Sequence, residues 1–234
     1  MEIHIIYEDE NLLVVEKPAG MNVYLENSKE KTLIGLISER FPKTINVGIP
    51  PRYGLVHRLD KETSGIVLIA KTNEALMLLQ QSFKEGKVTK KYLALVSGKL
   101  TEKQSKVETV IRRSPKDPQK QQAFPLQSPE AQQTGSRKAV TEYKALSFFQ
   151  DFTYVEVFPK TGRRHQIRCH FSYLGHPVAG DKLYSFKNQL VLENLNRHFL
   201  HASYLKISLP KGESKEFHSD LPEDLKNILN QLKS

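Results

Sequence analysis

Short apolar runs separated by polar turns occupy most of this chain of 234 residues. Residues 3–7 and 12–16 predict two strands around a polar turn. The uninterrupted apolar run at residues 66–70 predicts a strand buried on both faces. Further strands are predicted at residues 92–97, 140–149, 152–158 and 200–209, and around Phe217.

Apolar residues spaced three or four apart predict helices between these strands. Residues 32–41 have this spacing, and Pro42 ends the segment. Few helices mixed irregularly with strands indicate an α+β protein rather than a doubly wound parallel sheet. The other predicted helices are residues 74–84 with Asn73 as N-cap, residues 165–174 with Ile167, Phe171 and Leu174 facing inward, and residues 222–232.

Residues 112–136 have a different composition, with four prolines, many Gln, Ser and Lys residues and few large apolar ones. We interpret them as a long loop or hairpin tip, inserted in a single domain that spans residues 1–234. Six basic and two acidic residues lie between Ile111 and Val140. An RNA contact and a merely solvated insertion are both compatible with this balance.

The chain carries 35 Lys and Arg against 26 Asp and Glu, a net charge of +9. Such a charge bears on partners rather than on fold, and nucleic acid is the leading polyanion. No apolar run is long enough to span a membrane, and early acidic residues argue against a signal peptide. Cys169 is the single cysteine, which excludes an internal disulfide. We therefore expect a cytoplasmic protein with no membrane partner.

One carboxylate stands in a basic block just before the predicted strand at residues 66–70. Residues 57–65 read HRLDKETSG, and Asp60 lies beside Arg58 and Lys61. Nearby positive charge keeps a carboxylate ionised, and an ionised aspartate can act as nucleophile, general base or electrostatic partner. The alternative is a structural aspartate that accepts backbone hydrogen bonds in a turn.

Other kinds of site fit the sequence poorly. Ser64, His57 and Asp60 could form a triad, but no Gly-x-Ser-x-Gly elbow surrounds the serine. His165 and His170 are five residues apart and lack a metal-binding pattern, and no glycine-rich phosphate loop is present. We expect no metal and no cofactor.

Two further groups of residues are candidates for contact with RNA. Tyr92 follows Lys90 and Lys91, an arrangement that suits base stacking as well as an ordinary core tyrosine. The second group is a basic block, residues 160–168, at the start of a predicted helix, where free backbone N–H groups help to bind phosphate. In this block Arg164 and Arg168 are one helical turn apart, which predicts a common side.

Five segments, taken together, resemble the RluA-type RNA pseudouridine synthases. The resemblance runs from about residue 5 to residue 230, and its motifs at residues 57–65 and 160–181 are long and specific. Arg164 and Cys169 depart from the residues usual in the family. In chain order the segments are residues 9–20, 57–65, 91–98, 160–181 and 200–202.

The resemblance implies an enzyme that isomerises uridine to pseudouridine within RNA, without cofactor or metal. It implies one domain with a bent, mixed, largely antiparallel sheet, flanking helices and a central catalytic cleft. Asp60 would be the catalytic aspartate and Arg168 its partner. Tyr92 would stack on the uracil, Leu200 would pack on its far side, and Arg58 would fill the space left by the flipped nucleotide. The expected RNA-binding residues are His57, Lys90, Lys91, Arg163, Arg164 and His165.

The target RNA stays open at this point. A stem-loop of ribosomal or transfer RNA is expected, with no obligatory protein partner and without the S4-type RNA-binding domain of many relatives. The alternative is a catalytically silent RNA-binding or ribosome-assembly protein on the same fold. It is disfavoured because an ionised Asp60 in a basic cleft repels phosphate. An RNA hydrolase that uses Asp60 as base would need a second acid or a metal, for which the sequence offers no candidate.

Overall fold

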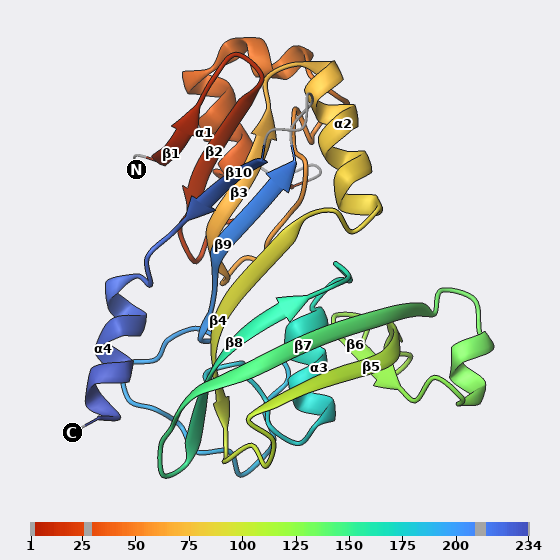
Figure 1. Cartoon of the computed structure of the whole chain (residues 1–234), viewed down its shortest axis with the longest axis vertical. Coiled ribbons are helices and arrows are strands. Elements are labelled where there is room, and N and C mark those ends of the chain that lie inside the picture. The colour runs from red at the N-terminus through yellow and green to blue at the C-terminus, as the bar shows by residue number, and fades with distance from the viewer. Residues whose placement is uncertain (1–2, 26–29, 209–213, 234) are drawn as a thin grey trace. The chain divides into compact units, whose positions relative to one another are not determined.

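The computed structural model describes residues 3–25, 30–208 and 214–233. The chain divides into two compact units, coloured by residue number in Figure 1. The first unit contains residues 1–90 and 202–220, and the second contains residues 91–201 and 221–234. The single domain expected over residues 1–234 stays a prediction.

The sheet of the first unit contains strands from both ends of the chain. Its order is β1-β2-β3-β9, and β10 pairs with β9. The pairings β1–β2, β2–β3 and β9–β10 are antiparallel. All residues of β3 are buried, as the apolar run predicts, and position 209 of the last predicted strand lies outside the described residues. The bounds are β1 His4–Glu8, β2 Leu12–Lys17, β3 Ser64–Ala70, β9 Leu200–Ser208 and β10 Ser214–His218.

Helix α1 (Leu33–Arg40) confirms the helix predicted before Pro42, which starts the short 3₁₀ helix η1 (Pro42–Asn46). Its N-cap is Thr32, whose hydroxyl accepts an N–H of the first turn. The helix buries Leu33, Ile34 and Ile37. These residues follow the spacing from which the helix is predicted.

Helix α2 (Asn73–Lys84) is correctly predicted, but its predicted cap is wrong. The N-cap is Thr72, whose hydroxyl accepts an N–H of the first turn. The Asn73 side chain instead accepts the N–H of Gly48 (2.7 Å) and donates to the carbonyl of Asn46 (3.2 Å). Thr and Asn both cap helices well. Here Asn73 is used to bond the loop at residues 46–48, so Thr72 becomes the cap.

The core of the first unit forms where the strands pack against α2. Leu76 and Leu79 of the helix lie against the inner faces of the strands. Because β3 is covered on both faces, it carries only small and apolar residues. The buried strand residues in this cluster are Leu12, Val14, Ile66, Leu68, Ala70, Leu205, Ile207 and Phe217.

In the second unit the strands follow the order β4-β8-β7-β5-β6, and each described pairing among them is antiparallel. Strands β4, β7 and β8 confirm the predicted ones. Strand β5 was not predicted, because Gln, Ser, Lys and Glu interrupt its buried residues. The bounds are β4 Thr89–Ser97, β5 Gln104–Arg113, β6 Gln121–Phe124, β7 Arg137–Phe148 and β8 Phe152–Pro159.

The segment 112–136, expected to be a long loop or hairpin tip, holds short regular elements. It contains the end of β5, all of β6 and the 3₁₀ helix η2 (Pro129–Gln132). Strand β6 pairs with β5 over four residues, so the segment forms the distal part of a β arm. Its expected contact with RNA stays a prediction.

Two helices complete the second unit, α3 (Gln166–Tyr173) and α4 (Glu223–Gln231). Ile167 and Phe171 of α3 are buried, as predicted. Leu174 is 36% exposed, so its predicted inward position is wrong. It follows the last helical residue, where the chain turns away. No helix within the described ranges is long and apolar enough to cross a membrane.

Candidate active site

The loop that carries Asp60 is fixed at Asp60 and at the residues that follow it. Within the loop, the Thr63 N–H donates to the Asp60 carbonyl (3.1 Å). The carbonyl of the adjacent Lys61 accepts the N–H of Gly20 (3.0 Å) and the ammonium of Lys17 (2.9 Å). Asp60 itself is half-buried. These bonds give the backbone that bears the carboxylate a defined position.

Lys17 at the end of β2 is fully buried and was missed in the sequence. Its ammonium donates to the carbonyls of Pro18 (2.8 Å), Met21 (2.8 Å) and Lys61 (2.9 Å). An ammonium can be buried only when its protons have acceptors, and here three main-chain oxygens supply them. Lys17 thus ties the turn after β2 to the neighbour of Asp60. The sequence did contain a signal for this role, because a charged residue ends an otherwise apolar strand.

Gly65 ends the Asp60 motif because no other residue fits there. Its φ is +117°, and a β-carbon would lie 2.2 Å from the carbonyl oxygen of Ala202 in β9. The backbones of β3 and β9 therefore approach each other where only hydrogen can stand between them. This contact fixes the other end of the Asp60 loop.

His57, at the start of the motif, is neutral and serves the fold. Its half-buried ring stacks on Phe83 (4.8 Å between centroids, 17° between planes), and Nε2 accepts the N–H of Leu68 (3.1 Å). Burial and the charge of Lys90 lower the pKa of His57 to about 3. The expected RNA contacts of His57 and Lys90 stay predictions, and His57 would contribute an uncharged ring to them.

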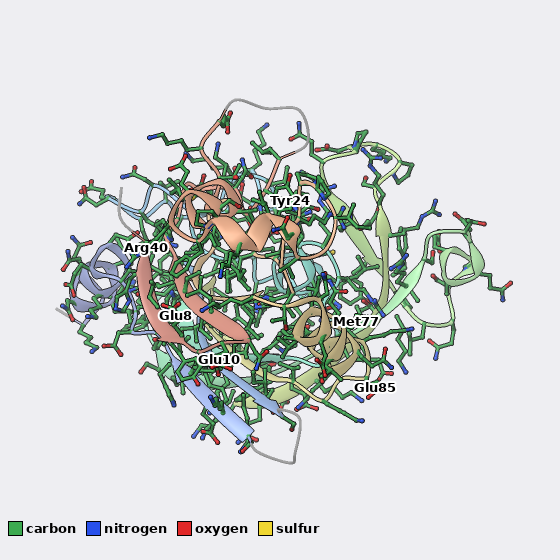
Figure 2. All side chains as sticks on the ribbon, turned by 90° about the horizontal axis from the view of Figure 1, so that it is seen from above. Glu8, Glu10, Tyr24, Arg40, Met77 and Glu85 are labelled. Atoms are coloured by element: carbon green, nitrogen blue, oxygen red, sulfur yellow. The ribbon has the colours of Figure 1, made fainter. Side chains whose placement is uncertain are left out.

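Arg58 contacts an aromatic residue that sequence reasoning missed. Its Nη1 donates to the hydroxyl of Tyr24 (3.0 Å), and its guanidinium carbon lies 5.2 Å from the centre of that ring. The guanidinium of Arg52 lies 4.8 Å from the same ring. Both arginines are exposed, and Tyr24 is labelled in Figure 2. The ring thus holds two cations at the surface, where they can meet phosphate.

In the second unit, Arg168 forms a buried bidentate ion pair with Asp181. Arg168 Nε donates to Oδ2 (2.6 Å) and Nη2 donates to Oδ1 (2.9 Å). Asp181 Oδ1 also accepts the N–H groups of Leu183 (2.9 Å) and Tyr184 (3.1 Å). Burial alone would raise the pKa of Asp181, but the bonds and charge of Arg168 outweigh it and lower the pKa. Asp181 belongs to the recognised motif, yet its role was not foreseen.

His165 precedes α3 in a left-handed conformation, with φ 53° and ψ 20°. Its Nδ1 lies 3.1 Å from the hydroxyl of Tyr184, which also accepts the N–H of Gln121 in β6 (2.7 Å). The Tyr184 ring centre lies 5.1 Å from the guanidinium carbon of Arg168. A non-glycine residue in this region is uncommon and needs support from its surroundings.

The predicted common side of Arg164 and Arg168 is wrong. Because His165 is left-handed, the helix begins only at Gln166, and Arg164 lies exposed in the preceding turn. Arg163 is half-buried and its Nε donates to the carbonyl of Lys138 (3.0 Å). The RNA contacts expected of Arg163, Arg164 and His165 stay predictions.

Tyr92 and Leu200 lie in one apolar cluster of the second unit. Leu200 is buried there with Ile167 of α3, and the half-buried Tyr92 packs against the cluster. Lys91 Nζ lies 3.7 Å from a carboxylate oxygen of Glu156. The structure therefore gathers Tyr92, Leu200 and the helix of Arg168 in the second unit, while Asp60 and Arg58 belong to the first. The pairing of Asp60 with Arg168 stays a prediction.

A cavity of about 560 Å³ in the first unit is separate from these residues. It is lined by α1, η1 and the adjacent turns, with Arg40, Phe41, Lys71 and Glu10 among its walls. None of the residues expected to act on RNA lines it. Across the described residues, no group of three or more His, Cys, Asp or Glu side chains is placed to hold a metal ion.

Comparison with known proteins identifies the relatives of this chain. A family described as RNA pseudouridylate synthase matches residues 11–173. The RNA pseudouridine synthase YlyB of Bacillus subtilis is 36% identical over all of this chain and 74% of its own length. The ribosomal large subunit pseudouridine synthase D of Yersinia pestis is 32% identical over 99% of this chain and 71% of its own.

Solved structures agree with these relatives and with the predicted α+β fold. The human RNA pseudouridylate synthase domain containing 4 is 25% identical, with a TM-score of 0.79 over 98% of this chain and 93% of its own. The human domain containing 1 is 26% identical, with a TM-score of 0.73 over 100% and 95%.

Proposed function

Because this chain belongs to the RNA pseudouridylate synthase family, and is therefore an RNA pseudouridine synthase, we propose that Asp60 is its catalytic group. The reaction breaks the bond from ribose C1′ to uracil N1 and forms a bond from C1′ to C5. The C5 hydrogen leaves as a proton, and N1 gains one. No oxidant or reductant is needed, and the residues proposed below require no cofactor.

The local structure around Asp60 supports this role. Two donors, the ammonium of Lys17 and the N–H of Gly20, anchor the carbonyl of Lys61 next to Asp60, and Gly65 constrains the end of the loop. Such constraint favours catalysis because a preorganised group loses little orientation freedom when substrate binds. An aspartate in this position can attack the sugar, add to the base or remove a ribose proton, and the proposal covers all three.

The other site residues have supporting roles in this proposal. The target base must leave its stack, which costs a few kcal/mol. Tyr92 stacks on the extruded uracil, Leu200 packs on its other face, and Arg58 occupies the space that the nucleotide leaves. Arg168 pairs with Asp60 and keeps its carboxylate ionised and oriented.

We further propose that the substrate is a stem-loop of large-subunit ribosomal RNA, modified in the cytoplasm. The support is the set of relatives named ribosomal large subunit pseudouridine synthase D, which are 31–34% identical to this chain. The net charge of +9 suits a polyanion of this kind. A stem-loop of transfer RNA is the second substrate class to test.

The test compares the wild-type protein with Asp60→Asn on ribosomal and transfer RNA from cells that lack the gene. Loss of the C5 hydrogen is followed by tritium release from RNA labelled at C5 of uridine. We expect the wild type to release tritium from large-subunit RNA and the variant to be at least about 10²–10⁴-fold slower. RNA affinity should stay within a few-fold. Turnover by Asp60→Asn at the wild-type rate refutes the role of Asp60.

Other outcomes separate the remaining alternatives. Modification of transfer RNA alone refutes the ribosomal substrate and leaves the enzyme intact. Wild-type protein that binds RNA tightly but modifies none indicates the catalytically silent binding protein. Free uracil among the products indicates hydrolysis instead of isomerisation.

A further inference from the structure

We propose that Asp181 is a positioning residue that sets the orientation of the Arg168 guanidinium. The inference rests on the catalytic role proposed for Arg168. It concerns a carboxylate that need not touch RNA itself, because it acts through the arginine. The observation behind it is the buried, two-bond ion pair between these residues.

The geometry of the pair restrains rotation of the guanidinium. Asp181 engages Nε and Nη2, along one edge of the planar group, at 2.6 and 2.9 Å. Two parallel bonds fix both the plane of a guanidinium and its direction, which one bond cannot do. The proposed bond to Asp60 would use the remaining N–H groups, whose direction is then set by Asp181.

Asp181 can act in this way because its own carboxylate is held. Its Oδ1 accepts the N–H groups of Leu183 and Tyr184, two and three residues further along the chain. The carboxylate is therefore fixed to the turn that follows it. Arg168 projects from α3, so the pair joins that turn to the helix.

Tyr184 covers the same guanidinium from a second direction. Its ring centre lies 5.1 Å from the guanidinium carbon of Arg168. Its hydroxyl accepts the N–H of Gln121 in β6 and contacts Nδ1 of His165. One short segment, residues 181–184, thus supplies a carboxylate to the edge and an aromatic ring to the guanidinium. Through the bond from Gln121, the arm that contains β6 is joined to the same tyrosine.

A contribution to folding stability is by itself a weak explanation for the buried ion pair of Arg168 and Asp181. Removing two charges from water costs about as much as their attraction returns, and apolar residues of similar volume often serve a core better. Arg168 is 7% exposed and Asp181 is 1% exposed, so both bear this cost. A requirement for a cation of fixed direction accounts for the arrangement.

The test measures kcat, KM and RNA affinity for Asp181→Asn. The amide is isosteric and keeps an oxygen for the N–H groups of Leu183 and Tyr184, but its charge and one acceptor oxygen are lost. We expect kcat to fall about 10–100-fold, because small errors in orientation are costly in catalysis. KM and RNA affinity should change less than about 3-fold.

The control is Asp224→Asn, in a bidentate pair of the same unit whose carboxylate is 52% exposed. Arg197 Nε and Nη2 donate to Asp224 at 2.7 and 3.1 Å. A purely structural role for Asp181 would make the two variants alike, with lower thermal stability and unchanged kcat. We expect that pattern for Asp224→Asn only.

If Asp181→Asn does not fold, Asp181→Glu tests the positioning role instead. It keeps the charge and the ion pair but displaces the guanidinium by one methylene. Reduced kcat with retained RNA affinity supports positioning, and wild-type kcat overturns it.

A double-mutant cycle with Arg168→Gln shows whether Asp181 acts through the arginine. We expect Asp181→Asn to have little further effect on kcat once Arg168 is replaced. An equal effect in both backgrounds overturns the inference. Full activity in Arg168→Gln alone refutes the proposed role of Arg168. Wild-type kcat in folded Asp181→Asn, with Asp60→Asn inactive, refutes only the positioning role.

Discussion

His57 makes the stability of this protein depend on pH in a direction that its pKa fixes. Burial and Lys90 lower the pKa of His57 to about 3 in the folded chain, whereas an unfolded histidine titrates near pH 6.5. The unfolded state therefore binds more protons between these values. The contribution of His57 is complete above about pH 6.5 and is lost as the pH falls toward 3. At about pH 5 the loss amounts to about 2 kcal/mol.

The assay is urea unfolding at about pH 8 and pH 5, followed by circular dichroism, for the wild type and His57→Gln. Glutamine can accept the N–H of Leu68 but does not titrate, so the variant should lose about 2 kcal/mol less on acidification. Burial also lowers the pKa of His170, to about 4, and this contributes a loss in both proteins. Only the difference between the proteins is therefore diagnostic. Lys90→Met should shift the pKa of His57 upward and reduce the loss in part.

The same pH dependence in the wild type and in His57→Gln would show that the imidazole is not held neutral. Its stacking on Phe83 and its bond from Leu68 would then have to tolerate a proton on the ring. That result would also reopen a charged role for His57 in binding phosphate.

Three further variants test the loop and the surface around Asp60. Lys17→Met removes the donor shared by three main-chain oxygens and should lower the free energy of unfolding by about 3–5 kcal/mol in urea; a loss under about 1 kcal/mol would contradict the structural role. Gly65→Ala places a methyl group against the Ala202 carbonyl and should lower the thermal midpoint by at least about 6 °C in calorimetry. An unchanged midpoint would show that β3 and β9 can separate at no cost. Tyr24→Phe keeps the ring but removes the acceptor for Arg58, so RNA affinity in filter binding should fall about 2–10-fold. Unchanged affinity would separate the Tyr24–Arg58 bond from RNA binding.

Local patterns predicted the elements that depend on neighbouring residues. The apolar run of β3 predicted a strand, the spacing of α1 predicted a helix, and a polar turn separated the two strands predicted for β1 and β2. Strand β5 was missed because its exposed face is polar and β7, with which it pairs along most of its length, lies far along the chain. Pairing across the sheet, which no local window contains, makes it a strand.

Site residues, too, could be predicted from the sequence where local motifs identify them, but not where their roles depend on distant residues. Asp60 and Arg168 stand in long motifs and could be named from the sequence. Lys17 and Asp181 could not be given roles, because Lys61 and Arg168, the partners that link them to the site, lie 44 and 13 residues away. The placement of Arg164 on the helix was also mistaken, because it lies in the turn before α3. A single left-handed residue, His165, shifted the helix start, and its ring contacts the hydroxyl of Tyr184, 19 residues further along the chain.

The place of β9 beside β3 has a consequence for the order in which the protein is made. The ribosome completes residues 1–90 more than a hundred residues before it reaches Ala202, yet the first unit needs both segments. Residues 54–56 bond to residues 68–70 on one edge of the fully buried β3, but the rest of that edge has no strand to pair with until β9 arrives. Unpaired edges of apolar strands recruit other chains. A nascent or truncated chain that stops before residue 202 would therefore be prone to aggregate through β3, and chaperones would have to shield it.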